Sequence, residues 1–247
     1  MKLTLAEPKY LKDSISIISD LVNEARFKIT PNAVELVAMD PANVAMVVFK
    51  LLSSAFSEYK VEEKVELAIN LSNMKQILRR AKPTDVLTLE IAEDKLKLQL
   101  KSNTTRTFYM PIIELEDKEQ KVPELEFPLT VKTNSALLSD SIEDVDVVGE
   151  SVSFGVDKDV LTIMAEGDLN KAKVDIKADD DTVITNSSNE AVKAKYSIEY
   201  LKKMIQGDKL SEHVEIKFNK DYPLMVEYKA VDKVLMKFIL APRVEND

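Results

Sequence analysis

Apolar and polar residues alternate along much of this chain, which is the pattern of β-strands with one buried face. Clear examples are Val86–Ile91 and Lys95–Leu100. Other segments carry apolar residues at helical spacing, such as the stripe that follows Pro8 and runs from Leu11 to Val22. A helix followed by strands occurs twice in each half of the chain. The pattern predicts four short helices packed on extensive sheet.

The two halves of the chain follow one plan. The corresponding strand pairs are Phe27–Thr30 with Val34–Met39 and Val152–Val156 with Val160–Ala165. Further on, Ser72 opens a short helix in the first half and Ser197 opens one in the second, and each half closes on an apolar run that reaches Pro111 or Pro242. The offsets are 127 residues (27 to 154), 125 (72 to 197) and 130 (108 to 238). So regular a spacing predicts two similar domains.

An acidic segment separates the halves. Between Glu114 and Glu126 it holds six carboxylates and two lysines, with Pro111 before it and Pro123 inside it. Such a composition is typical of an exposed, extended linker. We therefore expect an N-terminal domain over residues 1–113, a connecting loop over 114–127 and a C-terminal domain over 128–247.

Three of the four predicted helices carry bases opposite their apolar stripe. The first has Lys9 and Lys12, and the fourth has Lys202 and Lys203 before Gly207, a residue suited to ending it. In the second helix, which we expect Ser72 to cap, the basic row is Lys75, Arg79 and Lys82. Lysines on a solvated face explain any one helix alone. Three such helices in an acidic chain favour a surface that meets phosphates.

The third predicted helix, Ser135–Val145, breaks this pattern. It carries Asp140, Glu143 and Asp144 and no base. Its polar face would repel phosphate, so the helices do not form a uniformly basic surface.

The composition limits the classes of function. A net charge of −9 and a pI near 4.9 argue against a surface that adsorbs nucleic acid everywhere. The longest apolar run, Val44–Phe49, is far short of the ~20 residues of a membrane helix. Met1–Lys12 has no apolar core of a secretory signal, and the chain has no cysteine. We expect a soluble, intracellular protein that does not bind membranes.

Catalytic motifs are not visible in the sequence. The single histidine, His213, starts an alternating strand, and all four glycines lie from Gly149 onward, so no glycine-rich phosphate loop is present. The run Asp179–Asp181 reads as a loop, because adjacent carboxylates point in different directions. We expect no enzymatic activity, no cofactor and no metal site.

Several segments of the chain resemble the proliferating cell nuclear antigen (PCNA) family of DNA sliding clamps. They are Glu24–Pro31, Leu36–Met46, Arg106–Phe108, Pro223–Tyr228 and Leu240–Glu245. The archaeal branch is the most similar, because the tail is short and Asn43 stands where eukaryotic members carry histidine. The resemblance covers the whole chain in order, including the linker.

This resemblance implies an α+β DNA-clamp fold: two similar domains, each with two short helices packed on antiparallel sheets, and a pseudo-sixfold ring formed by a trimer. The helices would line the hole around double-stranded DNA and contact phosphates without sequence preference. The residues that match basic inner-helix positions are Lys9, Lys12, Lys75, Arg79, Arg80, Lys82, Lys202 and Lys203.

The resemblance also implies a docking site for short peptide motifs, of the PCNA-interacting type, that carry a glutamine and apolar or aromatic anchors. DNA polymerase, the clamp loader, flap endonuclease and DNA ligase would be tethered there for replication and repair. The matching positions are Met39, Asn43, Val44, Met46, Val122, Pro123, Leu125, Phe127, Pro223, Ile239, Ala241, Pro242 and Val244. Without the resemblance, Met39, Val44 and Met46 would be read as core.

Subunits of the family join by pairing an edge strand near Thr104–Met110 with one near Lys171–Ala178. Beside these strands, the matching charges are Arg80, Lys82 and Arg106 on one subunit and Asp140 and Asp144 on the next. Both clusters on one chain favour a homotrimer, but one subunit of a heterotrimeric or checkpoint-type clamp stays an alternative. The expected location is the cytoplasm, with the nucleoid, for an archaeal protein and the nucleus for a eukaryotic one.

Overall fold

The computed structural model describes residues 1–116, 120–188 and 190–243 of the chain. These residues form two compact units. One comprises residues 1–41, 47–122 and 230–236, and the other residues 42–46, 123–229 and 237–247. In each half of the chain the same succession of α-helices and strands occurs: a strand, a helix, five strands, a helix and three strands.

The bounds follow in chain order. The first half contains β1 (Lys2–Leu5), α1 (Lys9–Ser19), β2 (Glu24–Ile29), β3 (Ala33–Met39), β4 (Ala45–Leu52), β5 (Glu58–Lys60), β6 (Val65–Asn70), α2 (Leu71–Leu78), β7 (Val86–Ala92), β8 (Lys95–Lys101) and β9 (Thr105–Pro111). The second contains β10 (Leu129–Asn134), α3 (Ser135–Asp146), β11 (Ser151–Asp157), β12 (Val160–Glu166), β13 (Lys171–Lys177), β14 (Val183–Asn186), β15 (Val192–Ser197), α4 (Ile198–Met204), β16 (His213–Phe218), β17 (Leu224–Ala230) and β18 (Val234–Leu240).

Two strand orders recur in the sheets. The five-stranded order β5-β1-β7-β8-β9 has its counterpart in β14-β10-β16-β17-β18, and the four-stranded order β13-β12-β11-β15 has its counterpart in β4-β3-β2-β6. In the chain's nine-stranded sheet, β18 lies beside β4, which joins one order to the other. Strands β9 and β13, which hold the equivalent places, end their sheets.

Backbone hydrogen bonds flank the junction of β4 and β18 at both ends. The N–H of Leu52 donates to the carbonyl of Lys233 at 2.9 Å, and the N–H of Ala241 donates to the carbonyl of Val44 at 2.9 Å. Because low residue numbers on one strand meet high numbers on the other, the two strands run antiparallel.

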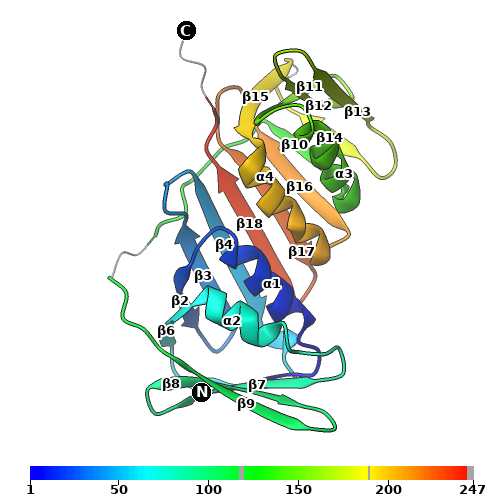
Figure 1. The fold of residues 1–247 in the computed structure, drawn as a ribbon. Helices are drawn as coiled ribbons and strands as arrows, with labels where there is room; N and C mark the ends of the chain where they lie inside the picture. The colour runs from blue at the N-terminus through cyan, green and yellow to red at the C-terminus, as the bar shows by residue number, and fades with distance from the viewer. Residues whose placement is uncertain (117–119, 189, 244–247) are drawn as a thin grey trace. The chain divides into compact units, whose positions relative to one another are not determined.

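The helices pack in pairs, α1 with α2 and α3 with α4 (Figure 1). Pro8 precedes α1, as expected, and the apolar side of the helix, with Leu11, Ile15 and Ile18, is buried. The cap of α2 differs from the expected Ser72: the side-chain Oδ1 of Asn70 accepts from the N–H of Asn73 at 2.9 Å. Asn70 has extended backbone, as a capping residue requires, and Ser72 already lies inside the helix.

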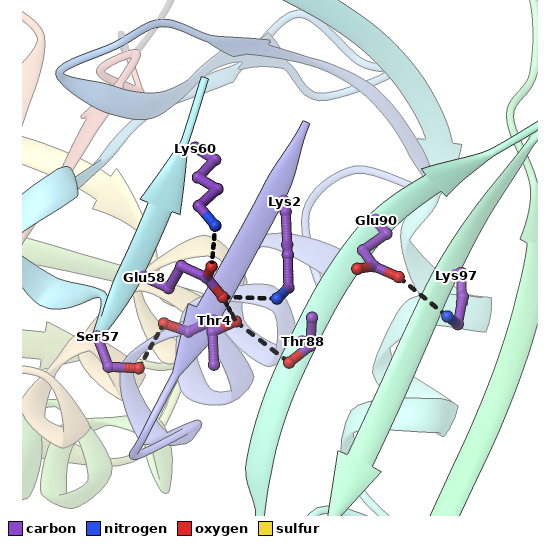
Figure 2. Close-up of polar contacts among 8 residues, drawn as sticks. All are labelled: Lys2, Thr4, Ser57, Glu58, Lys60, Thr88, Glu90 and Lys97. Atoms are coloured by element: carbon purple, nitrogen blue, oxygen red, sulfur yellow. Dashed lines mark hydrogen bonds and ion pairs between the residues drawn. The ribbon is translucent and has the colours of Figure 1, made fainter. Parts of the chain in front are cut away.

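The sheet β5-β1-β7-β8-β9 carries polar side chains on one face (Figure 2). The carboxylate of Glu58 accepts from Lys2 at 2.8 Å and from Lys60 at 2.7 Å, and these bonds lower the pKa of Glu58 to about 2. Thr4 joins Glu58 to Thr88 through hydroxyl contacts of 3.3 and 3.2 Å. The opposite face is apolar and supplies buried leucines to the core, namely Leu3, Leu5, Leu87, Leu89, Leu96, Leu98 and Leu100.

Gly207 was expected to end the fourth helix, but α4 ends at Met204 and Gly207 lies inside the following 3₁₀ turn, Ile205–Lys209. Its role is to admit an aromatic ring. A Cβ at this position would lie 2.3 Å from ring atoms Cδ2 and Cε2 of Tyr228, a fully buried residue. The ring packs on the bare backbone, so glycine is required here by contact and not by chain termination.

Replacing Gly207 with alanine should destabilise the protein by about 1–3 kcal/mol, because the buried Tyr228 ring cannot move aside without disturbing its neighbours. Chemical denaturation monitored by circular dichroism measures this. The matched control is Gly155→Ala on strand β11, where the nearest atom to the new Cβ, the carbonyl oxygen of Val192, is 3.7 Å away. Equal stabilities of the two variants would contradict the steric explanation.

Candidate nucleic-acid and subunit interfaces

Some of the cationic side chains on and just after α1 and α2 are bonded to groups of the same chain, and others are not. The Lys12 ammonium donates to the carbonyl of Ala81 at 3.0 Å, just beyond the end of α2. Lys75 reaches back from α2 to the Asp20 carboxylate at 2.6 Å and to the Ser16 carbonyl at 3.3 Å. Both lysines therefore join the two helices. Lys9 and Arg79 are exposed and have no ion pair within the described part of the chain.

The cations of α4 are all paired locally. Lys202 contacts the Asp146 carboxylate at 2.6 Å, at the end of α3, and Lys203 contacts Glu199 at 3.2 Å. The Lys203 ammonium also lies 5.1 Å from the ring centroid of Tyr200. These side chains are partly exposed, so the pairs are weak and leave the lysines able to exchange partners.

Helix α3 turns acidic side chains to solvent, as its sequence pattern predicted. Asp140, Glu143 and Asp144 are exposed, while Leu138 and Ile142 are fully covered on the opposite side. The strand β13 packs against this helix. An open strand edge and an acidic helix face thus belong to the same region of the second unit.

The cluster predicted from Arg80, Lys82 and Arg106 is only partly open. Arg80 and Lys82 are exposed just after α2, but the guanidinium of Arg106 is engaged at both ends. Its Nη1 donates to the carbonyl of Arg80 at 2.8 Å, and its Nη2 pairs with the carboxylate of Asp85. The sequence pattern did not single out Asp85, because a lone aspartate before an alternating strand reads as a turn residue.

Asp85 is completely buried, which is unusual for an aspartate. The backbone N–H of Lys82 donates to its Oδ2 at 2.7 Å. That hydrogen bond, the Ser102 hydroxyl and the Arg106 guanidinium together lower the pKa of Asp85 to about 2, against the opposing effect of burial. The carboxylate therefore stays ionised and ties the α2–β7 loop to strand β9.

Strand β9 borders a groove of ≈ 320 Å³ beside α2. Its lining residues are Asn73, Gln76, Ile77, Arg80, Phe108, Tyr109, Met110 and Pro111. Along β9, side chains alternate between exposed and less exposed positions, and Tyr109 keeps 59% of its surface open. Strand β13 shows the same alternation over seven residues. Each edge thus has one solvent face and one face turned to its own helices.

The residues predicted to bind partner peptides occupy different environments. Met46 and Ile239 are buried at 4% and 6% exposure, so they contribute to the core. Val44 and Pro242 are half-buried and Ala241 is exposed. Asn43 has a φ of 56°, a left-handed conformation that asparagine tolerates well, and is exposed.

A second group forms around Phe127. Its ring meets Tyr222 edge-on, with 5.6 Å between centroids, and Pro223 follows Tyr222 directly. The hydroxyl of Tyr196 donates to the Tyr222 carbonyl at 2.8 Å and fixes that turn. Leu125 is half-buried and Pro123 exposed in the same unit. The half-buried Met39 and the exposed Val122 belong to the first unit, and Val244 lies outside the described residues.

Two family models match the chain: the N-terminal domain of proliferating cell nuclear antigen over residues 1–121 and its C-terminal domain over residues 121–243. A relative described as a DNA polymerase sliding clamp, from Nanoarchaeum equitans, is 33% identical over 247 residues, which cover 98% of this chain and 99% of the relative. One from Thermococcus gammatolerans is 34% identical over 239 residues, 96% of each. The chain belongs to the PCNA family.

Solved structures agree with this PCNA fold. The PCNA of Thermococcus kodakaraensis has a TM-score of 0.91 at 23% identity, covering 98% of this chain and 99% of the other. That of Entamoeba histolytica has a TM-score of 0.91 at 21% identity, covering 98% of each. The predicted α+β clamp fold, with two short helices on antiparallel sheets in each of two domains, is confirmed.

The candidate catalytic and metal-binding residues considered in the sequence of this PCNA-family chain lie apart from one another. His213 is exposed at the start of β16, opposite Asn134 on β10. Asp179 accepts from the N–H groups of Asp181 and Thr182, which is a turn contact. Within the described ranges, no three His, Cys, Asp or Glu side chains come together as metal ligands. No helix among them is long and apolar enough to cross a membrane.

Proposed function

We propose that this PCNA-family chain is the sliding clamp of a DNA polymerase: three copies close head to tail into a ring around duplex DNA. The ring holds other proteins on the template and carries out no reaction itself. Its clients are the polymerase, the clamp loader, flap endonuclease and DNA ligase, each docked through a short peptide motif.

The observation that carries this proposal is the repeated strand order. Inside the chain β18 lies beside β4, whereas the equivalent strands β9 and β13 have no neighbour on one side among the described elements. A second copy that places its β13 beside β9 would reproduce the internal junction. The same contact then recurs at every copy, and such a heterologous contact either closes into a ring or grows a filament.

Charge complementarity supports the same contact. Arg80 and Lys82 are exposed near β9, and Asp140 and Asp144 are exposed on the helix that packs on β13. Both halves of the contact are present on one chain, which favours a homotrimer. The alternative of a heterotrimeric clamp predicts that the chain expressed alone stays monomeric.

A cross-linking experiment tests ring closure, and the chain offers a clean background because it has no cysteine. We expect Thr107→Cys combined with Lys173→Cys or with Asp175→Cys to form disulfides between copies, since paired residues of neighbouring strands lie within disulfide range. Two second positions are needed because the alternation along β13 is compatible with registers that differ by two residues. The products on a non-reducing denaturing gel should end at three copies.

The single-cysteine variants are the controls and should give no ladder beyond two copies. A ladder that continues past three copies would indicate a filament, and the absence of any cross-link in both double variants would contradict pairing of these edges.

The proposed DNA contact is weak and non-specific. Four of the eight predicted cations have an internal partner (Lys12, Lys75, Lys202 and Lys203), and the face of α3 is acidic. Retention on DNA then depends on encirclement and not on affinity. Lys9 and Arg79, which are exposed and unpaired in the described part of the chain, supply most of the phosphate contact.

Replacing Lys9 and Arg79 together with alanine should flatten the salt dependence of binding to linear duplex, by about 0.9 in the log–log slope for each phosphate that is no longer neutralised. The double variant Lys75→Ala with Lys202→Ala removes the same charge and should change the slope less, because those lysines are already paired. Fluorescence anisotropy over a salt series measures both.

Clamps loaded on a closed circle of DNA should stay bound, and linearising the circle should release them. Equal retention on circular and linear DNA would rule out encirclement.

Client peptides are proposed to dock on the half-buried apolar groups around Val44 and Phe127. Both groups combine apolar surface with fixed backbone, through the Ala241–Val44 hydrogen bond and the Tyr196–Tyr222 hydrogen bond. Because this surface is already formed, the protein does not have to order it on binding, which lowers the free-energy cost of association. Met46 and Ile239 would support this surface from below.

A synthetic peptide with one glutamine and apolar and aromatic anchors should bind with a Kd in the micromolar range or tighter, about −8 kcal/mol or better. Ala241→Arg should abolish binding, because a long charged side chain would cover the apolar surface. Ala191→Arg, at another exposed alanine of the second unit, is the control. Titration calorimetry measures both, and undiminished binding to Ala241→Arg would move the site elsewhere.

A further inference from the structure

The side chain of Arg106 raises a question about the proposed subunit contact, on which this inference rests. The resemblance to PCNA grouped Arg106 with Arg80 and Lys82 as cations for a second copy. A guanidinium that binds a partner's carboxylate needs free donors facing outward. Here both terminal nitrogens of Arg106 point to groups of its own chain, the Arg80 carbonyl and the Asp85 carboxylate.

We propose that Asp85 and Arg106 form an internal latch that fixes edge strand β9 to the end of α2, and that Arg80 and Lys82, without Arg106, are the cations offered to the next copy. Asp85 is a positioning residue in this assignment. It acts on the subunit contact through Arg106 and through the α2–β7 loop.

The burial of Asp85 is the reason to assign Arg106 a role inside the chain. Asp85 is 0% exposed, and an ionised carboxylate at such a site needs its countercharge close by. Arg106 is the only cation that contacts the Asp85 side chain in the described structure. If Arg106 turned to a second copy, it would leave a buried charge uncompensated, so the exchange is unfavourable.

The latch connects three segments that meet at the edge. Asp85 accepts from the Lys82 N–H, while the Asp85 N–H donates to the Lys82 carbonyl at 3.0 Å, which closes the α2–β7 loop. Arg106 lies on β9 and holds the carbonyl of Arg80. Arg80 in turn lines the groove with Phe108 and Tyr109. The latch therefore sets both the position of the edge strand and the place from which the Arg80 cation projects.

A rigid edge matters because adding a strand costs less when the template strand is already ordered. Loss of the latch should weaken assembly without removing an ion pair between copies. Loss of Arg80 should weaken assembly and remove one. The two effects differ in salt dependence, since salt screens an exposed ion pair between copies much more than a pair with a buried carboxylate.

The test compares Arg106→Gln with Arg80→Gln in the full chain. Each should raise the dissociation constant of the oligomer, by about tenfold or more for hydrogen bonds to charged groups, as measured by sedimentation at several salt concentrations. Arg80→Gln should flatten the salt dependence, and Arg106→Gln should leave it unchanged. Lys101→Gln, an exposed charge on the adjacent strand β8, is the control and should do neither.

Double-mutant cycles identify the partner of each arginine. In assembly, Arg80→Gln should be non-additive with Asp140→Asn/Asp144→Asn, while Arg106→Gln should be additive with it. Reversing both aspartates, Asp140→Lys/Asp144→Lys, should give a monomer, because like charges would then face each other across the proposed contact. In urea unfolding of that variant, Arg106→Gln should be non-additive with Asp85→Asn. Arg106→Lys keeps the charge but cannot make both bonds, so it should not restore assembly.

The proposal would be overturned if Arg106→Gln coupled to the α3 aspartates and flattened the salt dependence as Arg80→Gln does. It would also fail if Arg106→Gln lowered only the stability of the monomer and left the dissociation constant unchanged, which is the result of a purely structural role. If the unaltered chain stays monomeric, the ring proposal fails instead, and the unfolding cycle still tests the contact between Asp85 and Arg106.

Discussion

The proposed assembly depends on one constraint: the backbone N–H and C=O groups at an open sheet edge need hydrogen-bond partners. Strands β9 and β13 each present one row of backbone N–H and C=O groups with no strand beside it in the described chain. Such edges invite pairing of any kind, and proteins usually cover or charge them. In this chain each edge is accompanied by a charged surface of opposite sign, with Arg80 and Lys82 near one and the aspartates of α3 near the other. In the proposed ring, these charges would favour pairing of the two edges with each other.

The fold was predictable because its main determinants are local and repeated. Alternation along Val86–Ile91 assigned a strand and a buried face, and the offset of about 127 residues assigned two copies of one plan. The caps were less predictable: periodicity does not decide whether Asn70 or Ser72 begins α2, and the backbone conformation at Asn70 decides it. Gly207 was placed near the right turn for the wrong reason, since its constraint comes from the ring of Tyr228, 21 residues later (207 to 228).

Site residues were harder to predict than the fold, because contacts between distant residues decide what a charge does. Spacing along α2 put Lys75 on a basic row, but its ammonium meets Asp20, 55 residues earlier. Lys12 reaches Ala81, 69 residues later. Arg106 meets Asp85 in the same way, and Tyr222 joins Phe127 through an aromatic contact that no spacing indicates. A sequence pattern assigns a residue to a face, and only the folded chain tells whether its charge is already satisfied.

The β18–β4 junction and the proposed β9–β13 junction are structurally equivalent, and this equivalence has a consequence for how a ring would open. The first joins strands of one polypeptide, so its effective concentration is set by the covalent chain and does not change on dilution. The second joins separate polypeptides and loosens as the protein is diluted. A ring of this design would have junctions of two kinds. They would share a hydrogen-bonding pattern, but one is intramolecular and the other intermolecular. Opening the ring for passage of a duplex would break an intermolecular β9–β13 junction and leave every intramolecular β18–β4 junction intact.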